Sequence, residues 1–487
     1  MQKAFFSKTA QLLPPTVLTI FGATGDLSAS YLIPALLHMQ EHKLLPESFK
    51  LVCVGRRELN SKSFLSFILD KSASLRKVSS KTRSEFLKKL VYFQGDFDRP
   101  ESFGALAKLL SDHDQAEHEC YNRLFYFATK PQQFSSLAQI LKDQGLLVSC
   151  TAHKRQARVL VEKPFGFNLK SAQSLNKLLL KYFKEDQIYR IDHYAGKETV
   201  QNLMVVRFAN SLFEPLWNNK YIDHVEISVL EKGGVEDRTA YYNETGAIKD
   251  FLQNHILQML ALIAMDEPYN LTAEMIRDEK LRVLKALDTF DAEKIKNQLV
   301  KGQYKSYEKE VGGKTTTETY FALKTFVNLP RWAGVPFYLR SGKKLSKKTT
   351  EISVHFKEPV RCLFKGCDSN VLTFKIQPDE SVYLQINNKI PGFGIELYQA
   401  NLEFGYKSVF KGEIPSAYER LLLDFMEGDQ RLFIRSDEIE ASWKFVDSIT
   451  ESSQFTKAPT YVYEQGTNGP KEAEAWIAKD LKNWWTK

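Results

Sequence analysis

Residues 16–27 read Thr16-Val17-Leu18-Thr19-Ile20-Phe21-Gly22-Ala23-Thr24-Gly25-Asp26-Leu27. Six apolar or β-branched residues predict a buried strand, and the next six predict a glycine turn at the start of a helix. This unit suits a pyrophosphate, because glycine lets the backbone approach the phosphates and free amides face the anion. We therefore predict that Gly22, Ala23, Thr24, Gly25, Asp26 and Leu27 contact a dinucleotide. One glycine fewer than in the usual fingerprint leaves a plain tight turn as the alternative.

Around this unit, short strand-like runs alternate with helical segments from about residue 16 to residue 196. The strand candidates are 16–21, 51–54, 90–93, 124–127 and 158–161. This rhythm is typical of an α/β fold with a doubly wound parallel sheet.

After residue 192 the strand signals lengthen and cluster, at 221–230, 319–326, 351–356, 371–376 and 381–386. Helical periodicity is found at 248–265, 281–286, 417–428 and 437–447. We predict a mainly antiparallel sheet with helices packed on it. The change in pattern divides the chain into two domains, 1–197 and 198–487, as its length of 487 residues favours.

Composition narrows the class of protein. With 43% hydrophobic and 26% charged residues, the chain is typical of a soluble globular enzyme. Its net charge of +8 is spread without a basic tract, which favours local anion pockets over nucleic-acid binding. We find neither a run of about 18 apolar residues nor a signal segment, so we expect neither membrane insertion nor secretion.

The cysteines indicate whether the protein occupies an oxidising or a reducing compartment of the cell. Their number is odd, and Cys53, Cys120, Cys150, Cys362 and Cys367 lack the spacing of metal ligands. A chain of this length does not need disulfides to stabilise its core. We therefore expect a reducing cytoplasm and no metal ion in the site.

A basic pair follows the second predicted strand, because residues 51–55 lead directly into Arg56 and Arg57. NAD-binding proteins carry an acid near this point to hold the ribose, whereas arginine suits the 2′-phosphate of NADP. The pair therefore favours NADP, with two exposed surface arginines as the alternative.

Two further motifs carry charged side chains beyond predicted strands. Lys163, in Glu162-Lys163-Pro164-Phe165-Gly166, follows the strand 158–161 at the sheet edge where doubly wound folds bind ligands. The segment Arg190-Ile191-Asp192-His193-Tyr194-Ala195-Gly196-Lys197-Glu198 supplies donors for a phosphate dianion and an acid that can orient a histidine. A solvated loop is the alternative for each.

His255 lies on the apolar face of the predicted helix 248–265. A lone histidine there is more often part of the core. The functional alternative is a neutral base that takes a hydroxyl proton as hydride leaves. Asp250 is about 140° around an α-helix from His255, so we expect it to contact ligand rather than pair with the imidazole.

The segment 190–197 resembles the signature of the glucose-6-phosphate dehydrogenase family, with Ala195 in place of the usual leucine. Residues 22–27, 162–166, 253–258, 334–343 and 417–424 also resemble family motifs, in the family's order. The resemblance implies oxidation of D-glucose 6-phosphate to the lactone with reduction of NADP, the first step of the oxidative pentose phosphate pathway. It also implies a Rossmann-like N-terminal domain, a larger C-terminal α+β domain, and a homodimer, or a dimer of dimers, formed through the sheet of the second domain.

By the same resemblance, His255 would be the general base and Asp192 would orient it. The coenzyme would contact residues 22–27, Arg56, Asp96 and Lys163. The substrate would contact His193, Tyr194, Lys197, Glu231, Asp250, Lys343 and Lys348.

The chain departs from the family at Ser28-Ala29-Ser30, where basic residues are common, so its coenzyme affinity or its preference for NADP would be unusual. Two rival functions are weighed against the resemblance. A glucose-fructose-oxidoreductase-like enzyme would lack the phosphate-binding segment. A noncatalytic sugar-phosphate or NADP sensor would be expected to lose His255 or Asp192, and both are present.

Overall fold

The computed structural model describes residues 13–72, 75, 78–97, 99–116, 120–147, 157–410 and 413–485. They form two compact units. The first takes in Met1–Gly166, Lys170–Gly196 and Gly412–Ser436, and the second takes in Phe167–Leu169, Lys197–Lys411 and Asp437–Lys487.

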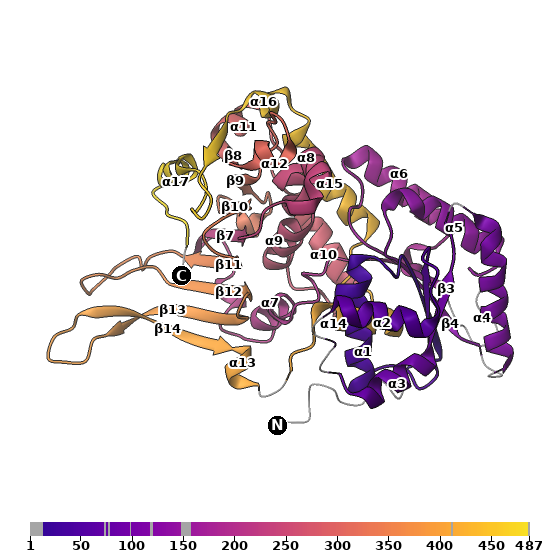
Figure 1. The fold of residues 1–487 in the computed structure, drawn as a ribbon. Helices are drawn as coiled ribbons and strands as arrows, with labels where there is room; N and C mark the ends of the chain where they lie inside the picture. The colour runs from indigo at the N-terminus through magenta and orange to yellow at the C-terminus, as the bar shows by residue number, and fades with distance from the viewer. Residues whose placement is uncertain are drawn as a thin grey trace. The chain divides into compact units, whose positions relative to one another are not determined.

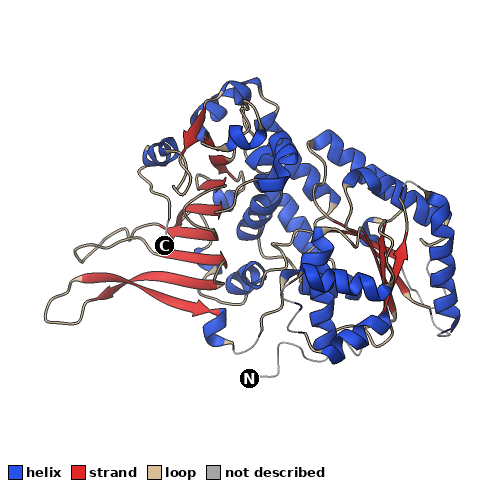
Figure 2. Cartoon of the chain, viewed as in Figure 1, coloured by secondary structure: helices blue, strands red, loops and turns tan. Residues whose placement is uncertain are grey.

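The first unit contains a six-stranded sheet in the order β3-β2-β1-β4-β5-β6, in which all neighbours are parallel (Figures 1 and 2). This arrangement confirms the predicted doubly wound sheet, and the strand order reverses between β1 and β4, where such sheets bind ligands. The short strand β6 was not predicted. The strands are β1 (Thr16–Phe21), β2 (Phe49–Gly55), β3 (Leu90–Gln94), β4 (Asn122–Phe127), β5 (Ala157–Val161) and β6 (Ile188–Arg190).

Helices connect these strands, as parallel pairing requires. A π-helix, η2 (Ser28–Leu32), follows the glycine turn and continues into α1. The α-helices of the first part of the chain are α1 (Ile33–Glu41), α2 (Ser61–Lys71), α3 (Ser80–Lys89), α4 (Gly104–Ala116), α5 (Phe134–Asp143) and α6 (Leu169–Leu180).

Helix α14 (Ala417–Glu427) joins the first unit from late in the chain. Its Leu421 and Phe425 are buried in one core with residues of β1, β2 and α1. Ser416 and Glu419 form a capping box at its start, and Gly428, with φ of 85°, ends it. The periodicity predicts this helix, but local pattern does not show that it packs with strands from the beginning of the chain.

The second unit contains a nine-stranded sheet in the order β14-β13-β12-β11-β7-β10-β9-β8-β15. Only β7 with β10 and β8 with β15 pair in parallel, so the predicted, mainly antiparallel sheet is confirmed (Figure 2). The strands are β7 (Ile222–Leu230), β8 (Leu299–Tyr304), β9 (Tyr320–Phe326), β10 (Pro336–Gly342), β11 (Thr349–Phe356), β12 (Val371–Gln377), β13 (Ser381–Lys389), β14 (Leu397–Gly405) and β15 (Thr460–Tyr463).

The helix predicted at 248–265 is two helices of different kind. A π-helix, η10 (Ile248–Ile256), comes first, and α9 (Leu257–Ala264) continues it. The other helices of this part of the chain are α7 (Glu198–Phe208), α8 (Thr239–Ala247), α10 (Ala273–Lys285), α11 (Ala292–Gln298), α12 (Tyr307–Val311), α13 (Tyr406–Val409), α15 (Ser436–Thr450), α16 (Ser453–Lys457) and α17 (Lys471–Ala478).

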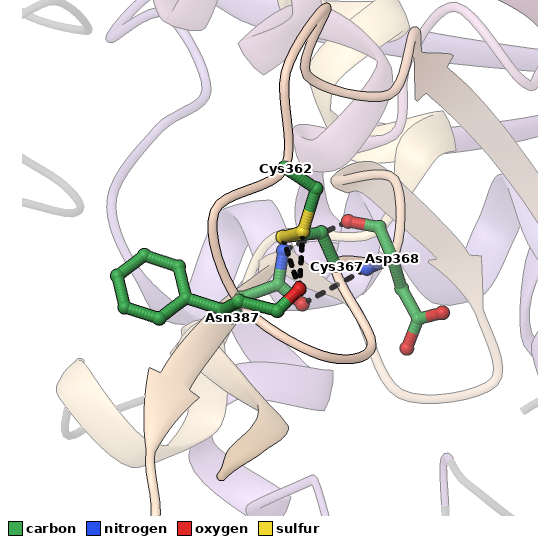
Figure 3. Close-up of a disulfide and its surroundings, with 5 residues drawn as sticks. Cys362, Cys367, Asp368 and Asn387 are labelled. Carbon is green, nitrogen blue, oxygen red and sulfur yellow. Dashed lines mark hydrogen bonds between the residues drawn. A yellow bond between two sulfur atoms is a disulfide. The ribbon is translucent and has the colours of Figure 1, made fainter. Parts of the chain in front are cut away.

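A disulfide joins Cys362 and Cys367 in the loop between β11 and β12 (Figure 3). The loop is tied to β13 beside it, where Asn387 donates to the carbonyl of Asp368 at 2.8 Å. The sequence predicts that the core of a chain of this length needs no disulfide, and this bond lies in a loop outside the core. The pairing is local, with Cα atoms 6.0 Å apart, a common separation for bonded cysteines, so it follows from the shape of one loop rather than from a need to staple the core.

None of the described helices combines the length and the apolar character that a membrane span requires.

Candidate functional site

The glycine turn lies at the carboxyl end of β1. Gly22 has φ of 87°, and a Cβ there would lie 2.5 Å from the carbonyl oxygen of Ala128, so only glycine fits. The amides of Gly22 and Ala23 both donate to the carbonyl of Val54, at 3.0 Å each, and that of Gly25 donates to Gly22. Three amides of the turn therefore donate hydrogen bonds to backbone carbonyls. The amides of Thr24, Asp26 and Leu27 are the remaining candidate donors to a phosphate.

The basic pair follows β2, which is the parallel neighbour of β1, so both features lie at one edge of the sheet. The side chains of Arg56 and Arg57 are exposed. The guanidinium of Arg57 lies 4.8 Å from the ring centre of Phe67, and its carbonyl accepts a hydrogen bond from the hydroxyl of Tyr92 at 2.8 Å. Stacking holds the Arg57 side chain in place, and Arg56 remains the predicted contact of a 2′-phosphate.

Sequence reasoning missed a cation in this region. Lys71, at the end of α2, forms an ion pair of 2.9 Å with Asp26 of the glycine turn, and its ammonium lies 5.1 Å from the ring centre of Phe67. Its place at the end of a surface helix gives no local signal. Asp96, the other predicted coenzyme contact, follows β3, the next strand along the same edge.

Lys163 follows β5, and Glu162, the residue before it, has a carboxyl with a raised pKa. The carboxylate of Glu162 accepts hydrogen bonds from Tyr126 at 2.6 Å and from Tyr418 at 3.5 Å. Burial raises the pKa of Glu162 to about 7, against the effect of these hydrogen bonds and of the neighbouring Lys163. Tyr418 belongs to α14, so this helix adds a phenol to the group.

The Asp-His-Tyr segment forms a loop after β6. The amide of Tyr194 donates to the carboxylate of Asp192 at 2.9 Å, which fixes this buried acid against its own backbone. The ring of His193 is nearly parallel to that of Tyr418, at an angle of 5° and a centre distance of 6.3 Å. Within the first unit, Tyr418 of α14 thus contacts both His193 and Glu162, the residue before Lys163.

In the second unit, Lys197 lies immediately before α7 and is half-buried. Burial lowers the pKa of Lys197, the carboxylate of Glu380 raises it, and the charge of Lys348 lowers it further. Lys197 and Lys348 therefore lie close enough to repel each other. Two cations held together in this way are typical of an anion site.

Glu231 and Lys343, both predicted site residues, form an ion pair. Leu230 and Gly342 are register partners in the parallel pair β7 and β10, so the residues that follow them emerge side by side. Nζ of Lys343 donates to Oε2 of Glu231 at 2.5 Å. The same ammonium lies 5.2 Å from the ring centre of Tyr242 and 5.1 Å from that of Phe251.

Phe251 belongs to η10, the π-helix that also carries Asp250 and His255, both buried. Backbone hydrogen bonds in a π-helix join residues five apart, so Asp250 and His255 lie about one turn from each other, and the separation of 140° expected for an α-helix is wrong. Glu318 fixes the start of η10, because its carboxylate accepts the amide of Ile248 at 3.0 Å and fills the space beside Gly246.

The structure thus brings together predicted residues within each unit. The second unit joins Glu231 and Lys343 to the π-helix of Asp250 and His255, and it places Lys197 near Lys348. Asp192 belongs to the first unit and His255 to the second, and their pairing stays a prediction.

Comparisons with known proteins identify the family to which the chain is similar. Two family models match the chain: "Glucose-6-phosphate dehydrogenase, NAD binding domain" over residues 19–202, and "Glucose-6-phosphate dehydrogenase, C-terminal domain" over residues 204–485. The chain is 43% identical over 486 residues to a glucose-6-phosphate 1-dehydrogenase of Borreliella burgdorferi, with 96% of this chain and 98% of that protein covered.

A glucose-6-phosphate 1-dehydrogenase of Bacillus subtilis is 39% identical over 488 residues, with 97% of this chain and 98% of that protein covered. A solved structure described as glucose-6-phosphate dehydrogenase in complex with its substrate glucose-6-phosphate has a TM-score of 0.90 at 32% identity. The structural similarity covers 98% of this chain and 100% of that chain.

Proposed function

The chain belongs to the glucose-6-phosphate dehydrogenase family, and we propose on that basis that it oxidises D-glucose 6-phosphate to 6-phospho-D-glucono-1,5-lactone while NADP is reduced. The observation that carries this proposal is the full-length likeness to a solved family member in complex with that sugar phosphate. The reaction opens the oxidative pentose phosphate pathway.

The first unit fits a dinucleotide. The turn at Gly22, where only glycine fits, and the exposed side chain of Arg56 follow neighbouring strands at the carboxyl edge of a parallel sheet. Residues 22–27, Arg56, Asp96 and Lys163 would hold NADP, which when bound supplies the acceptor for the hydride of C1. Lys71 would add positive charge near the pyrophosphate through its place beside Asp26.

The second unit supplies the base and most of the sugar contacts. We assign His255 as the general base that takes the proton of the C1 hydroxyl at a ring nitrogen as the hydride leaves C1, and Asp192 as the acid that orients the imidazole. Burial supports this role, because a base shielded from water keeps its lone pair for the substrate. Glu231, Asp250 and Lys343 would bind the sugar hydroxyls.

The phosphate of the substrate would be held by His193, Tyr194, Lys197 and Lys348. Support comes from the two lysines, since burial and mutual repulsion lower the pKa of Lys197 and a phosphate dianion would relieve that repulsion. Apart from these three residues of the segment 193–197, residues 1–197 would serve the coenzyme, and residues 198–487 would serve the substrate and dimerisation.

We also propose a homodimer formed through the β14 edge of the second sheet. This edge strand exposes Tyr398 at 66% and Leu402 at 60%, and the turn before it exposes Phe393 and Ile395. An apolar edge strand of this kind invites pairing with another chain. Replacing Leu402 with glutamate should shift the sedimentation of the purified protein from dimer to monomer.

We propose that the protein is located in the cytoplasm, where NADPH is consumed. A reducing compartment would keep the exposed Cys362 and its partner Cys367 as thiols, so the disulfide would form only after purification or under oxidation. Rapid alkylation of the protein in lysed cells, followed by peptide mass analysis, should find both cysteines modified.

The reaction itself is tested by mixing purified protein with D-glucose 6-phosphate and either NADP or NAD, and by recording the absorbance of the reduced coenzyme. Unphosphorylated glucose is the control. Reduction of NADP that depends on the phosphate supports the proposal. Tight binding of glucose 6-phosphate and NADP without reduction of either coenzyme would instead identify the noncatalytic sensor.

A further inference from the structure

A buried group of two histidines and one glutamate lies in the second sheet, and none of the three is assigned to the substrate site. His224 and Glu226 are two residues apart on β7, so their side chains point to the same face. His355 of β11 is the register partner of His224, and the register shifts immediately after it. Three ligand-type side chains therefore meet on one face of two adjacent strands.

We propose that His224, Glu226 and His355 form a binding site for a divalent transition metal, with Zn²⁺ as the ion that fits best. All three side chains are at least nine-tenths buried, and their ligand atoms lie within 4.8 Å of one another. Two imidazoles and one carboxylate are a common set of protein ligands for zinc, with water completing a tetrahedron.

The distances within this group suit metal ligands and are long for hydrogen bonds, although the contact of His224 with Glu226 still qualifies as one. Oε1 of Glu226 lies 3.4 Å from Nε2 of His224 and 3.3 Å from Nε2 of His355. Both exceed the usual N–H···O length of about 2.9 Å. Zinc ligands at about 2.0 to 2.1 Å in a tetrahedron are separated by about 3.3 to 3.4 Å, which is the spacing observed.

His355 provides a second, independent observation. Among the described residues, none accepts or donates a hydrogen bond at its Nε2, although this atom is buried. Buried polar nitrogens nearly always have a partner. An ion held between this nitrogen and the carboxylate of Glu226, 3.3 Å away, would give it a partner.

The surroundings supply the outer contacts that metal-binding histidines normally have. Oδ2 of Asp223 lies 2.6 Å from Nδ1 of His224, so Nδ1 can keep a proton when Nε2 gives up its own proton to bind a metal. Lys482 pairs with the same carboxylate. The second oxygen of Glu226 accepts the amide of Trp485 at 2.9 Å.

These contacts suggest what the metal would do. Lys482 and Trp485 belong to the C-terminal segment, and the ring of Trp485 packs edge-on against His355 with centres 5.3 Å apart. An ion on Glu226 would hold the carboxylate that fixes this segment. Binding of the ion would therefore hold the C-terminal segment against the sheet and should raise the melting temperature of the protein.

The test uses the full-length protein after dialysis against a chelator, titrated with zinc chloride in a calorimeter. Glu226→Gln and His355→Gln are the test variants. The control is His42→Gln, which alters the half-exposed group of His38, His42 and Glu413, another set of potential ligands. Oxidation of glucose 6-phosphate by each variant reports that it has folded.

We expect one zinc ion per chain in the unmodified protein and in the control, and affinity at least 100-fold weaker in both test variants. Equal affinity in all four proteins, loss of binding only in the control, or no binding by the unmodified protein would overturn the proposal. If a test variant does not fold, X-ray absorption of the zinc-loaded His42→Gln variant decides, because this variant lacks the second histidine of the control group. Two imidazole ligands with oxygen support the site, whereas sulfur or a single imidazole contradicts it.

Discussion

Lys343 donates a hydrogen bond from Nζ to Oε2 of Glu231 at 2.5 Å, directly beyond the parallel pair of strands β10 and β7. The register of one ladder therefore positions a cation and an anion of the proposed sugar site. The rings of Tyr242 and Phe251 lie near the ammonium and limit its contact with water. A sugar hydroxyl entering here would meet a donor and an acceptor in fixed positions.

Replacing Lys343 with glutamine should lower kcat/KM for glucose 6-phosphate by about 100-fold, because a charge-assisted contact is lost and Glu231 keeps an unpaired charge. Steady-state kinetics measure this. Lys232, which is exposed and next to Glu231, provides the control, and Lys232→Gln should leave kcat/KM within about twofold. Equal effects of the two substitutions would remove Lys343 from the sugar site.

Replacing Lys197 with methionine should raise KM for glucose 6-phosphate by about tenfold or more with little change in kcat, because binding is lost in the ground state and the transition state alike. The half-buried position of Lys197 near Lys348 gives the reason to expect a phosphate there. A matched substitution at the exposed Lys220 is the control. An unchanged KM would exclude a phosphate contact by Lys197.

Replacing Arg56 with alanine should raise KM for NADP by about tenfold and leave KM for NAD nearly unchanged, because only NADP carries the 2′-phosphate. Each coenzyme is thus the control for the other. Arg57 is held over Phe67, so Arg57→Ala should have the smaller effect on NADP. A similar rise in KM for both coenzymes would place Arg56 near the pyrophosphate instead.

The pair of His38 and Glu419 predicts a dependence of stability on pH. The hydrogen bond of 2.6 Å to Glu419 raises the pKa of His38 from 6.5 to about 9; burial opposes the shift and Glu413 adds to it. A histidine whose pKa is raised by folding contributes its full stabilisation at pH values below its pKa in the unfolded chain. This contribution disappears as the pH rises through its pKa in the folded protein. It is therefore largest at pH 6 and is lost between pH 6.5 and about 9.

A double-mutant cycle of His38→Gln and Glu419→Gln, measured by urea unfolding, checks this dependence. The coupling free energy should be no more than about 3 kcal/mol at pH 6 and near zero above pH 10. Glutamine at position 419 can still serve the capping box of α14. A coupling that does not change with pH would mean that the pair is not charged.

Local patterns in the sequence predicted most of the fold. The strand before Gly22 and the later runs of β-branched residues lie where expected, because their burial pattern is a property of each segment. The return of α14 to the first unit could not be predicted, since Leu421 and Phe425 would be apolar in either core.

Parts of the candidate site were beyond sequence reasoning for similar reasons. Periodicity cannot distinguish an α-helix from a π-helix, so the closeness of Asp250 and His255 along η10 was missed. Lys71 is distant in sequence from Asp26, and the strand of His355 is distant from that of Glu226. Only the folding of the chain brings the members of each pair together. The motif segments were recognisable because each places its chemistry within a few consecutive residues.

The base assignment of His255 is tested most directly by comparing the unmodified protein with His255→Asn in steady-state oxidation of glucose 6-phosphate by NADP. The account predicts that kcat falls by about 100- to 10,000-fold while KM for the sugar phosphate stays within about threefold, because the proton acceptor is lost and the binding groups remain. A kcat within tenfold of the original would contradict it, and the base would then have to be another residue.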